Sequence, residues 1–291
     1  MSVGLFLQLL VNGLMSGGIY AMVASGFTLI LGVMQVFNFA QGQFYMLGAF
    51  LTWAIVARLG LPYLVGVVAS LAAMAILGVV FHFLIIKWTL PHGFFHTMLV
   101  TVAFSTVVGQ TGTNTFAFNS RVVDPVVHGT LAVGDVTISY GKLLVIAGAI
   151  VVMVALYFFM KTKTGTAMQA AAENRDVAGL QGINAGRIFW ATMAVGSALC
   201  GVAGALIVPV LGAGNTMGGN VFVRAMLVIL IGGTGSMSGA LLAAFIVGII
   251  ESFAFQYVGT MNMVVVFACT ALLMFFRPGG LLGKPLPIPG Q

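Results

Sequence analysis

Arg224 and Glu251 are the two charged side chains that lie well inside long apolar stretches of this sequence. A charged side chain that faces lipid near the middle of a bilayer costs ~2.5–3.5 kcal/mol or more. Measured from the same side of a membrane at 1.5 Å per residue, Arg224 would lie roughly 5 Å deep and Glu251 roughly 9 Å deep. The similar depth predicts an ion pair, within one bundle or across a subunit interface, with a part in gating or solute passage as the alternative.

Three amide side chains, Asn38, Gln41 and Gln43, open another apolar stretch in VFNFAQGQFYM. An amide without a hydrogen-bond partner is costly in hydrocarbon, so each must face protein, water or a ligand. In one interpretation Asn38 caps the helix that follows and the glutamines bind neighbouring backbone. In the other, a broken helix end lines a solute path, because irregular backbone at membrane depth is tolerated only inside protein or beside a cavity.

No catalytic or metal-binding pattern accompanies these residues in the sequence. No histidine has a carboxylate or cysteine at metal-ligand spacing, as in H-E-x-x-H, and no G-x-x-x-x-G-K-[ST] phosphate-binding loop is present. Cys200 and Cys269 lie in apolar stretches, so a structural disulfide is not expected. The sequence predicts neither an enzyme nor a chain that binds ATP itself.

The composition explains why polar groups are so few. Hydrophobic residues make up 60% of the 291 residues and charged residues 5%, against roughly 25% charged residues in a soluble domain. The mean hydropathy is +1.15, and the apolar stretches are continuous rather than alternating as in a membrane β-barrel. We therefore predict an all-α, polytopic integral membrane helix bundle that is surrounded by lipid and binds no nucleic acid.

A spanning helix needs ~20 mostly apolar residues, and eight or nine segments of the chain come near this length. The candidates are 5–31, 39–57, 62–86, 96–114, 142–160, 187–211, 221–233, 240–256 and 261–277. The segments 39–57 and 221–233 could be broken or re-entrant helices. No Lys or Arg precedes Arg58, so the first segment is expected to be a retained span and not a cleaved signal peptide.

Basic residues accumulate on the cytoplasmic side of membrane proteins, which gives the orientation. With nine alternating segments and the N-terminus outside, the basic residues that fall inside are Lys87, Lys161, Lys163, Arg175, Arg187, Arg277 and Lys284. Arg58, Arg121 and Lys142 fall outside. The C-terminus is then inside, and the loop 115–141 is external, where it caps the bundle or offers a surface to an external partner.

The segment 161–186 is far more polar than its surroundings. Its first part, KTKTGTAMQAAAENRDVAGLQGIN, contains five charged residues. Thr166 and Gln169 fit a capping box, the alanines favour a helix, and Gly182 fits its end. The small side chains permit close contact with another protein, which a solvated connector would not require. We predict a short cytoplasmic docking helix, or two with a bend.

Three patches of the sequence resemble a known family: LLVNGLMSGGIYAMVASGFTLILGVMQVFNFAQGQFYMLGAF, GTAMQAAAENRDVAGLQGINAGRI, and LIGGTGSMSGALLAAFIVGIIES with RPGGLLG after it. They are similar to the LivH-type permease subunits of branched-chain amino acid ABC importers, over nearly the whole chain. The resemblance implies one transmembrane permease domain, 1–291. It also implies a multi-pass protein of the inner membrane of a bacterium.

In that family the segment 161–186 is the coupling segment, which contacts an ATP-hydrolysing partner. Carried onto this chain, the contact residues are Gly165, Ala171, Ala172, Glu173, Asn174, Asp176, Ala178 and Gly182. The implied assembly contains a second related permease chain, two ATPase subunits that bind ATP and Mg, and an external (periplasmic) solute-binding protein. This chain itself would bind no cofactor.

The implied mechanism is alternating access, in which two permease chains rock against each other around the solute. The expected path-lining residues are Asn12, Asn38, Gln41 and Gln43. The resemblance implies that the solute is a branched-chain or other hydrophobic amino acid, or a related small amide or acid. Gln41 stands where the family commonly has histidine, and this difference leaves the choice among these solutes open. A stand-alone secondary transporter or channel is the competing hypothesis, and such a carrier would not need the docking segment 161–186.

Overall fold

The computed structural model describes residues 3–116, 121–123, 129–133 and 136–282 of the chain. Helices account for most of these residues: α1 (Val3–Met34), α2 (Gln41–Trp53), α3 (Tyr63–Phe81), α4 (Lys87–Thr89), α5 (Phe94–Phe116), α6 (Tyr140–Met160), α7 (Lys163–Glu173), α8 (Arg175–Leu180), α9 (Ala185–Leu211), α10 (Met217–Gly232), α11 (Met237–Val258) and α12 (Asn262–Phe276). Two π-helical turns, Ala54–Arg58 and His82–Ile86, extend α2 and α3. Two 3₁₀ turns, Leu90–His92 and Gly259–Met261, precede α5 and α12.

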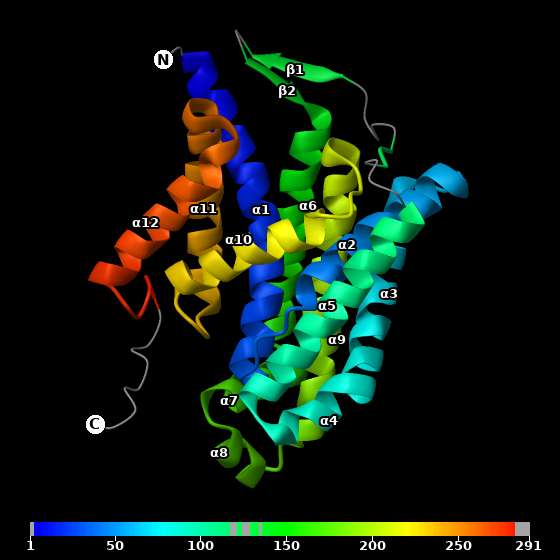
Figure 1. The fold of residues 1–291 in the computed structure, drawn as a ribbon, viewed down its shortest axis with the longest axis vertical. Coiled ribbons are helices and arrows are strands. Elements are labelled where there is room, and N and C mark those ends of the chain that lie inside the picture. The colour runs from blue at the N-terminus through cyan, green and yellow to red at the C-terminus, as the bar shows by residue number, and fades with distance from the viewer. Residues whose placement is uncertain (1–2, 117–120, 124–128, 134–135, 283–291) are drawn as a thin grey trace.

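One antiparallel hairpin accompanies the helices in the described part of the chain. β1 (Thr130–Val133) pairs with β2 (Val136–Ser139) within the loop that was expected to be external. The hairpin and the N-terminal end of α1 lie at one end of the bundle, whereas α7 and α8 lie at the opposite end (Figure 1). The docking segment and the hairpin are therefore separated by the length of the bundle.

In the part of the chain that the structure describes, six helical segments are long and apolar enough to cross a membrane. They are Val3–Met34, Tyr63–His92, Phe94–Gly112, Tyr140–Met160, Ala185–Leu211 and Met237–Phe276, the last containing both α11 and α12. Met217–Gly232 is a shorter apolar helix. The predicted all-α, multi-pass membrane bundle is thus confirmed.

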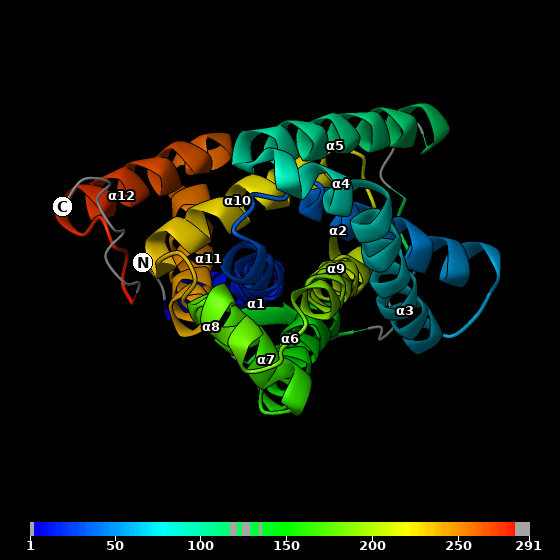
Figure 2. The ribbon, with the colours of Figure 1, turned by 90° about the horizontal axis from the view of Figure 1, so that it is seen from below.

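α1 is the central helix of the bundle, with α6, α9, α10 and α11 around it (Figure 2). It contains no charged residue, and its buried residues face all sides along its second half. A helix that is apolar all round is expected in the core of a bundle and not at its surface.

Glycines let α1 and α11 approach backbone to backbone. A Cβ atom added at Gly13 would lie 2.7 Å from the Cα of Ile249, and one added at Gly248 would lie 2.5 Å from the carbonyl oxygen of Gly13. Gly17 is equally close to α11. Lipid provides no hydrophobic drive between helices, so such close packing is a main source of their association. The spacing of Gly13 and Gly17 therefore fixes how α1 faces α11.

The docking segment forms two short helices, one of the two forms expected, but the first of them begins earlier than the predicted cap at Thr166. The hydroxyl of Thr162 accepts a hydrogen bond from Gly165 N at 3.3 Å and caps α7. The prediction of a Thr166 capping box is wrong, because Thr166 lies inside α7 and its hydroxyl donates to Thr162 O at 3.1 Å. Asn174 caps α8 through its side-chain oxygen, and Gly182, with φ of 81°, follows its end.

Candidate functional site

A polar cavity of about 640 Å³ lies near the end of the bundle that carries the N-terminus. α1 contributes Asn12, Ser16 and Tyr20, which recur every four residues and therefore share one helix face. Leu9, Met15 and Ile19 of α1 also line the cavity. The same helix thus supplies both a polar stripe and an apolar border.

The opposite wall comes from helices that are distant in sequence. α10 contributes Asn220 and Arg224, one turn apart, and α11 contributes Glu251 and Ser252. Asn262, the first residue of α12, adds to the polar lining, as do Tyr45, Thr216 and Gln256. The cavity therefore depends on how α1, α10, α11 and α12 pack together with α2 and α9, which contribute Tyr45, Ile207 and Leu211.

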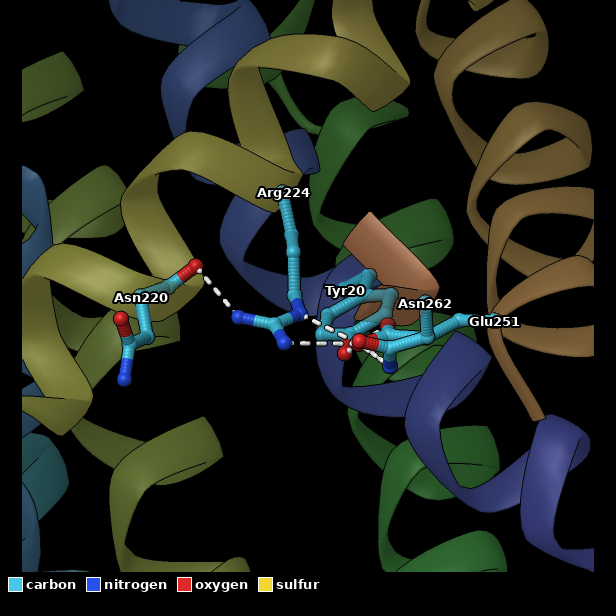
Figure 3. Close-up of polar contacts among 5 residues, drawn as sticks. All are labelled: Tyr20, Asn220, Arg224, Glu251 and Asn262. Atoms are coloured by element: carbon cyan, nitrogen blue, oxygen red, sulfur yellow. Dashed lines mark hydrogen bonds and ion pairs between the residues drawn. The ribbon is translucent and has the colours of Figure 1, made fainter. Parts of the chain in front are cut away.

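The structure brings Arg224 and Glu251 together, and two further residues join them (Figure 3). Nε and Nη2 of Arg224 both lie 2.7 Å from Oε1 of Glu251. Asn262 Nδ2 donates to the same oxygen at 3.2 Å. The hydroxyl of Tyr20 donates to Oε2 of Glu251 at 2.5 Å, and Arg224 Nη1 donates to the carbonyl oxygen of Asn220 at 3.0 Å.

This network makes a charged pair tolerable at membrane depth. The side chain of Arg224 is 18% exposed and that of Glu251 is 9% exposed. The cost of removing two charges from water is compensated only when the geometry of the ion pair is good and its remaining donors and acceptors have hydrogen-bond partners. Both oxygens of Glu251 have donors here, and hydrogen bonds to a charged group are stronger than neutral ones. The pair therefore ties four helices together at the cavity wall.

Asn12 marks the other side of the cavity. Its side-chain oxygen accepts a hydrogen bond of 2.7 Å from Nζ of Lys142, near the start of α6. Lys142 does not itself line the cavity, but with Arg224 it places two cations beside the cavity against one carboxylate among the described residues, Glu251. Such a surface has a surplus of positive charge, which favours a solute that carries a carboxylate group.

The other three expected path residues do not line this cavity. Residues 35–40 are non-helical, and Gln35 ends α1 with φ of 55°. Asn38 is fully buried, and its side-chain oxygen accepts from Ala40 N at 3.0 Å, so it satisfies the backbone just before α2. Gln43 Nε2 donates to Ser105 Oγ of α5 at 3.0 Å. In this conformation these amides face protein.

Gln41 and Gln43 each keep one atom without a partner among the described residues. Gln41 Oε1 accepts a long contact of 3.6 Å from the thiol of Cys200, but its Nε2 has no partner. Oε1 of Gln43 is likewise buried without a partner. Buried amide atoms that lack a partner are costly, so they call for a functional or conformational reason.

The residues expected at the ATPase contact fall into two groups. Ala172, Glu173, Asn174, Asp176 and Gly182 are exposed at the end of the bundle. Gly165, Ala171 and Ala178 are buried against the chain itself. An added Cβ at Gly165 would lie 2.5 Å from Met160 Cα, so this glycine serves the packing of α7 on α6. These three are not accessible to a partner here.

Val177 and Leu180 were missed by sequence reasoning and stand out at this surface. Val177 is 52% exposed and Leu180 is 87% exposed, both on α8. They are three residues apart and so share a helix face. The sequence signal was present, since both lie in RDVAGL inside the most polar segment of the chain. Neighbouring exposed apolar residues that form a contiguous patch often mark a protein contact.

A multi-pass helical bundle with a solute-sized cavity of mixed polar and apolar lining is compatible with a membrane transport protein. The model of the family described as "Branched-chain amino acid transport system / permease component" matches residues 9–276, and the chain belongs to that family. It is accordingly a permease subunit of an ABC importer and not an enzyme, with ATP hydrolysis and solute binding in partner proteins of such systems.

Individual relatives agree with the family over nearly full length. The chain is 31% identical to BraD, a high-affinity branched-chain amino acid transport system permease protein of Pseudomonas aeruginosa, over 96% of each chain. It is 28% identical to LivH, the protein of the same description in Escherichia coli, again over 96% of each chain.

Proposed function

We propose that the chain forms half of the translocation path for a branched-chain or other hydrophobic amino acid, with the polar cavity as its outer part. The single observation that carries this proposal is the mixed lining of that cavity. Arg224 in the lining would attract a carboxylate and Glu251 an ammonium group, while Leu9, Ile19 and other apolar neighbours suit an apolar side chain. Lys142, which donates to the lining residue Asn12, adds a second cation behind this wall. The relatives named above act on branched-chain amino acids, which fit this chemistry.

The inner part of the path is proposed at the start of α2. The unpartnered atoms of Gln41 and Gln43 would gain partners if a rearrangement brought solute or water beside them. Asn38 precedes them in the break between α1 and α2. Irregular backbone inside a membrane bundle is typical of helices that line a solute path.

The membrane topology is proposed to be that expected from the sequence. α2 and α10 would add partial crossings to the long segments, which gives eight or nine membrane segments within one permease domain, 1–291. The N-terminus and the loop 115–141 would face outside, and the segment 161–186 would face the cytoplasm. The bacterial relatives favour the inner membrane of a bacterium.

The cytoplasmic partner is proposed to be an ATPase that binds ATP and Mg and docks on α7 and α8. Val177, Leu180 and the exposed residues Ala172, Glu173, Asn174, Asp176 and Gly182 would form the contact. The assembly would contain two such ATPases, a second related permease chain and an external solute-binding protein.

Contacts that α7 and α8 make with α1 and α9 would transmit a movement of the docking surface to the cavity. Arg175 Nη2 donates to Val33 O, at the end of α1, at 3.1 Å, and its guanidinium lies 4.7 Å from the ring centre of Phe189 in α9. α7 also packs on α1, α6 and α9. A displacement of α7 and α8 would therefore act on α1, which carries Asn12 and Tyr20 at the cavity.

The test is purification of the tagged full-length chain from its native membranes in mild detergent, with partners identified by mass spectrometry. We compare wild type with Leu180→Arg and with His92→Arg, a control that adds the same charge to an exposed turn outside α7 and α8. We expect an ATPase and a second permease with wild type and the control. The Leu180→Arg variant should retain the permease and lose the ATPase.

Two results would contradict the proposal. Recovery of the wild-type chain alone from transport-competent membranes would favour a stand-alone carrier. Equal ATPase recovery with Leu180→Arg and His92→Arg would mean that α8 is not the docking surface.

A further inference from the structure

A second cavity, of about 420 Å³, lies between the α3–α5 connection and the start of α9. Its lining includes His82, Lys87, Arg187 and Trp190. α4 and α8 lie at the same end of the bundle, so this cavity is on the side of the docking segment, opposite the N-terminus (Figure 1). It shares no lining residue with the polar cavity described above.

The charges around this cavity are uncompensated within the described residues. Lys87 and Arg187 are both exposed, and neither pairs with a carboxylate in the described part of the chain. Arg187 also stands in the first turn of α9, where the helix dipole is positive and a cation is unfavourable. Two cations and a helix N-terminus therefore border one cavity, whose lining is otherwise mostly apolar.

A buried polar atom adds an independent sign of a ligand. His82 is only 4% exposed, lines the cavity, and has an Nδ1 atom without a hydrogen-bond partner among the described residues. The unpartnered Nδ1 of His82 and the position of Arg187 at a helix N-terminus both cost folding free energy. The stability of the helices therefore does not explain why these two residues are here. A bound anion would offset the cost of Arg187 at the helix N-terminus, and it would lie beside the buried His82.

The surroundings identify the source of the anion as lipid. Trp88 and Trp190 are exposed beside the cavity, and tryptophan is enriched where lipid head groups meet the hydrocarbon. Val80, Phe83 and Leu84 are exposed along α3 and its extension, which continues from the cavity into the membrane-spanning part. An acyl chain could follow this apolar track while the head group occupies the basic cavity.

We propose that this cavity binds the phosphodiester head group of an anionic phospholipid of the cytoplasmic leaflet. Lys87 and Arg187 hold the phosphate, the N-terminus of α9 faces it, and the two tryptophans pack beside the glycerol region. Basic pockets between membrane helices on the cytoplasmic side are suited to such lipids.

The experiment measures lipid binding by native mass spectrometry on the delipidated, full-length chain in detergent. Phosphatidylglycerol, phosphatidylcholine and inorganic phosphate are titrated separately. We expect one phosphatidylglycerol per chain, with phosphatidylcholine at least about tenfold weaker because it carries no net charge. Inorganic phosphate at millimolar concentration should not displace the bound lipid.

Matched variants locate the site. Lys87→Gln with Arg187→Gln should weaken phosphatidylglycerol binding about tenfold. Lys161→Gln with Lys163→Gln removes the same charge from the same end of the chain and should bind like wild type. The exchange Lys87→Arg with Arg187→Lys keeps the charge and should also bind. If the double glutamine variant does not fold, each single glutamine variant, expected to weaken binding about threefold, replaces it.

Three outcomes would overturn the proposal. Equal binding by the Lys87/Arg187 and Lys161/Lys163 glutamine variants would place the lipid elsewhere. Equal binding of phosphatidylcholine would remove the role of charge. Displacement by inorganic phosphate would make the cavity a site for free phosphate and not for lipid.

Discussion

Glu251 accepts hydrogen bonds from three helices other than its own. Tyr20 of α1, Arg224 of α10 and Asn262 of α12 all donate to its carboxylate. The variant Glu251→Gln would leave the guanidinium of Arg224 without its anion. Breaking a largely buried pair in this way costs about 3 kcal/mol, so we expect the free energy of unfolding in detergent to fall by about that amount.

A double-mutant cycle gives the control for this prediction. Arg224→Met together with Glu251→Gln removes both charges, so the unpaired cation disappears. We expect the double variant to lose less stability than the sum of the two single variants, with a coupling of at least about 1 kcal/mol. If the losses of unfolding free energy in the two single variants simply add in the double variant, the interaction between Arg224 and Glu251 does not contribute to stability.

The sequence was sufficient to predict this pair but not its neighbours. Arg224 and Glu251 were the only charges well inside apolar stretches, and the cost of an unpaired charge in lipid leaves few alternatives. Tyr20 and Asn262 carry no charge and lie in stretches with many similar residues. Their contacts depend on the rotation of α1 and α12 about their axes, which a sequence without tertiary contacts does not fix.

The close contact between α1 and α11 predicts that replacing Gly248 with alanine will destabilise the bundle. Gly248→Ala places a Cβ 2.5 Å from backbone atoms of Gly13 and Gly17, which cannot move like the end of a side chain. Overpacking of this kind typically costs about 1–3 kcal/mol, so the thermal unfolding midpoint in detergent should fall. The cavity wall should loosen as well, because Glu251 follows Gly248 by one turn of α11.

Gly219→Ala in α10 is the matched control, since nothing lies within 4 Å of its added Cβ. Alanine is the better helix former by roughly 0.5–1 kcal/mol, so this variant should be as stable as wild type or slightly more stable. If both substitutions lower the midpoint equally, glycine is needed for backbone freedom and not for the contact between helices.

α7 illustrates what the sequence of an element leaves open. In KTKTGT, Thr162 and Thr166 both satisfy the chemistry of an N-cap, and the choice of Thr162 follows from packing on α6 through Gly165. Small residues such as Ala171 and Ala172 are equally suited to packing on their own chain and to contact with a partner. One is buried and the other exposed, and only the tertiary structure separates them.

At the scale of the whole molecule, the two ends of the bundle carry different polar features. One end carries the N-terminus, the β1–β2 hairpin and the cavity beside Asn12, whereas the other carries α7, α8 and the basic cavity at Arg187 (Figure 1). The distribution of basic residues along the sequence predicts that the second end faces the cytoplasm. The number of crossings was harder to predict, because α2 and α10 are short and begin after non-helical turns.

Cysteine labelling tests this orientation in intact cells. In a Cys269→Ala background, which leaves only the buried Cys200, Thr137→Cys on β2 should react with a membrane-impermeant maleimide added outside. Leu180→Cys on α8 should react only after the membrane is permeabilised, because its side chain is exposed at the opposite end. Asn12→Cys should react from outside if the polar cavity is the outer part of the path. The reverse pattern for Thr137 and Leu180 would invert the topology and place the ATPase surface outside, where no ATP could drive it.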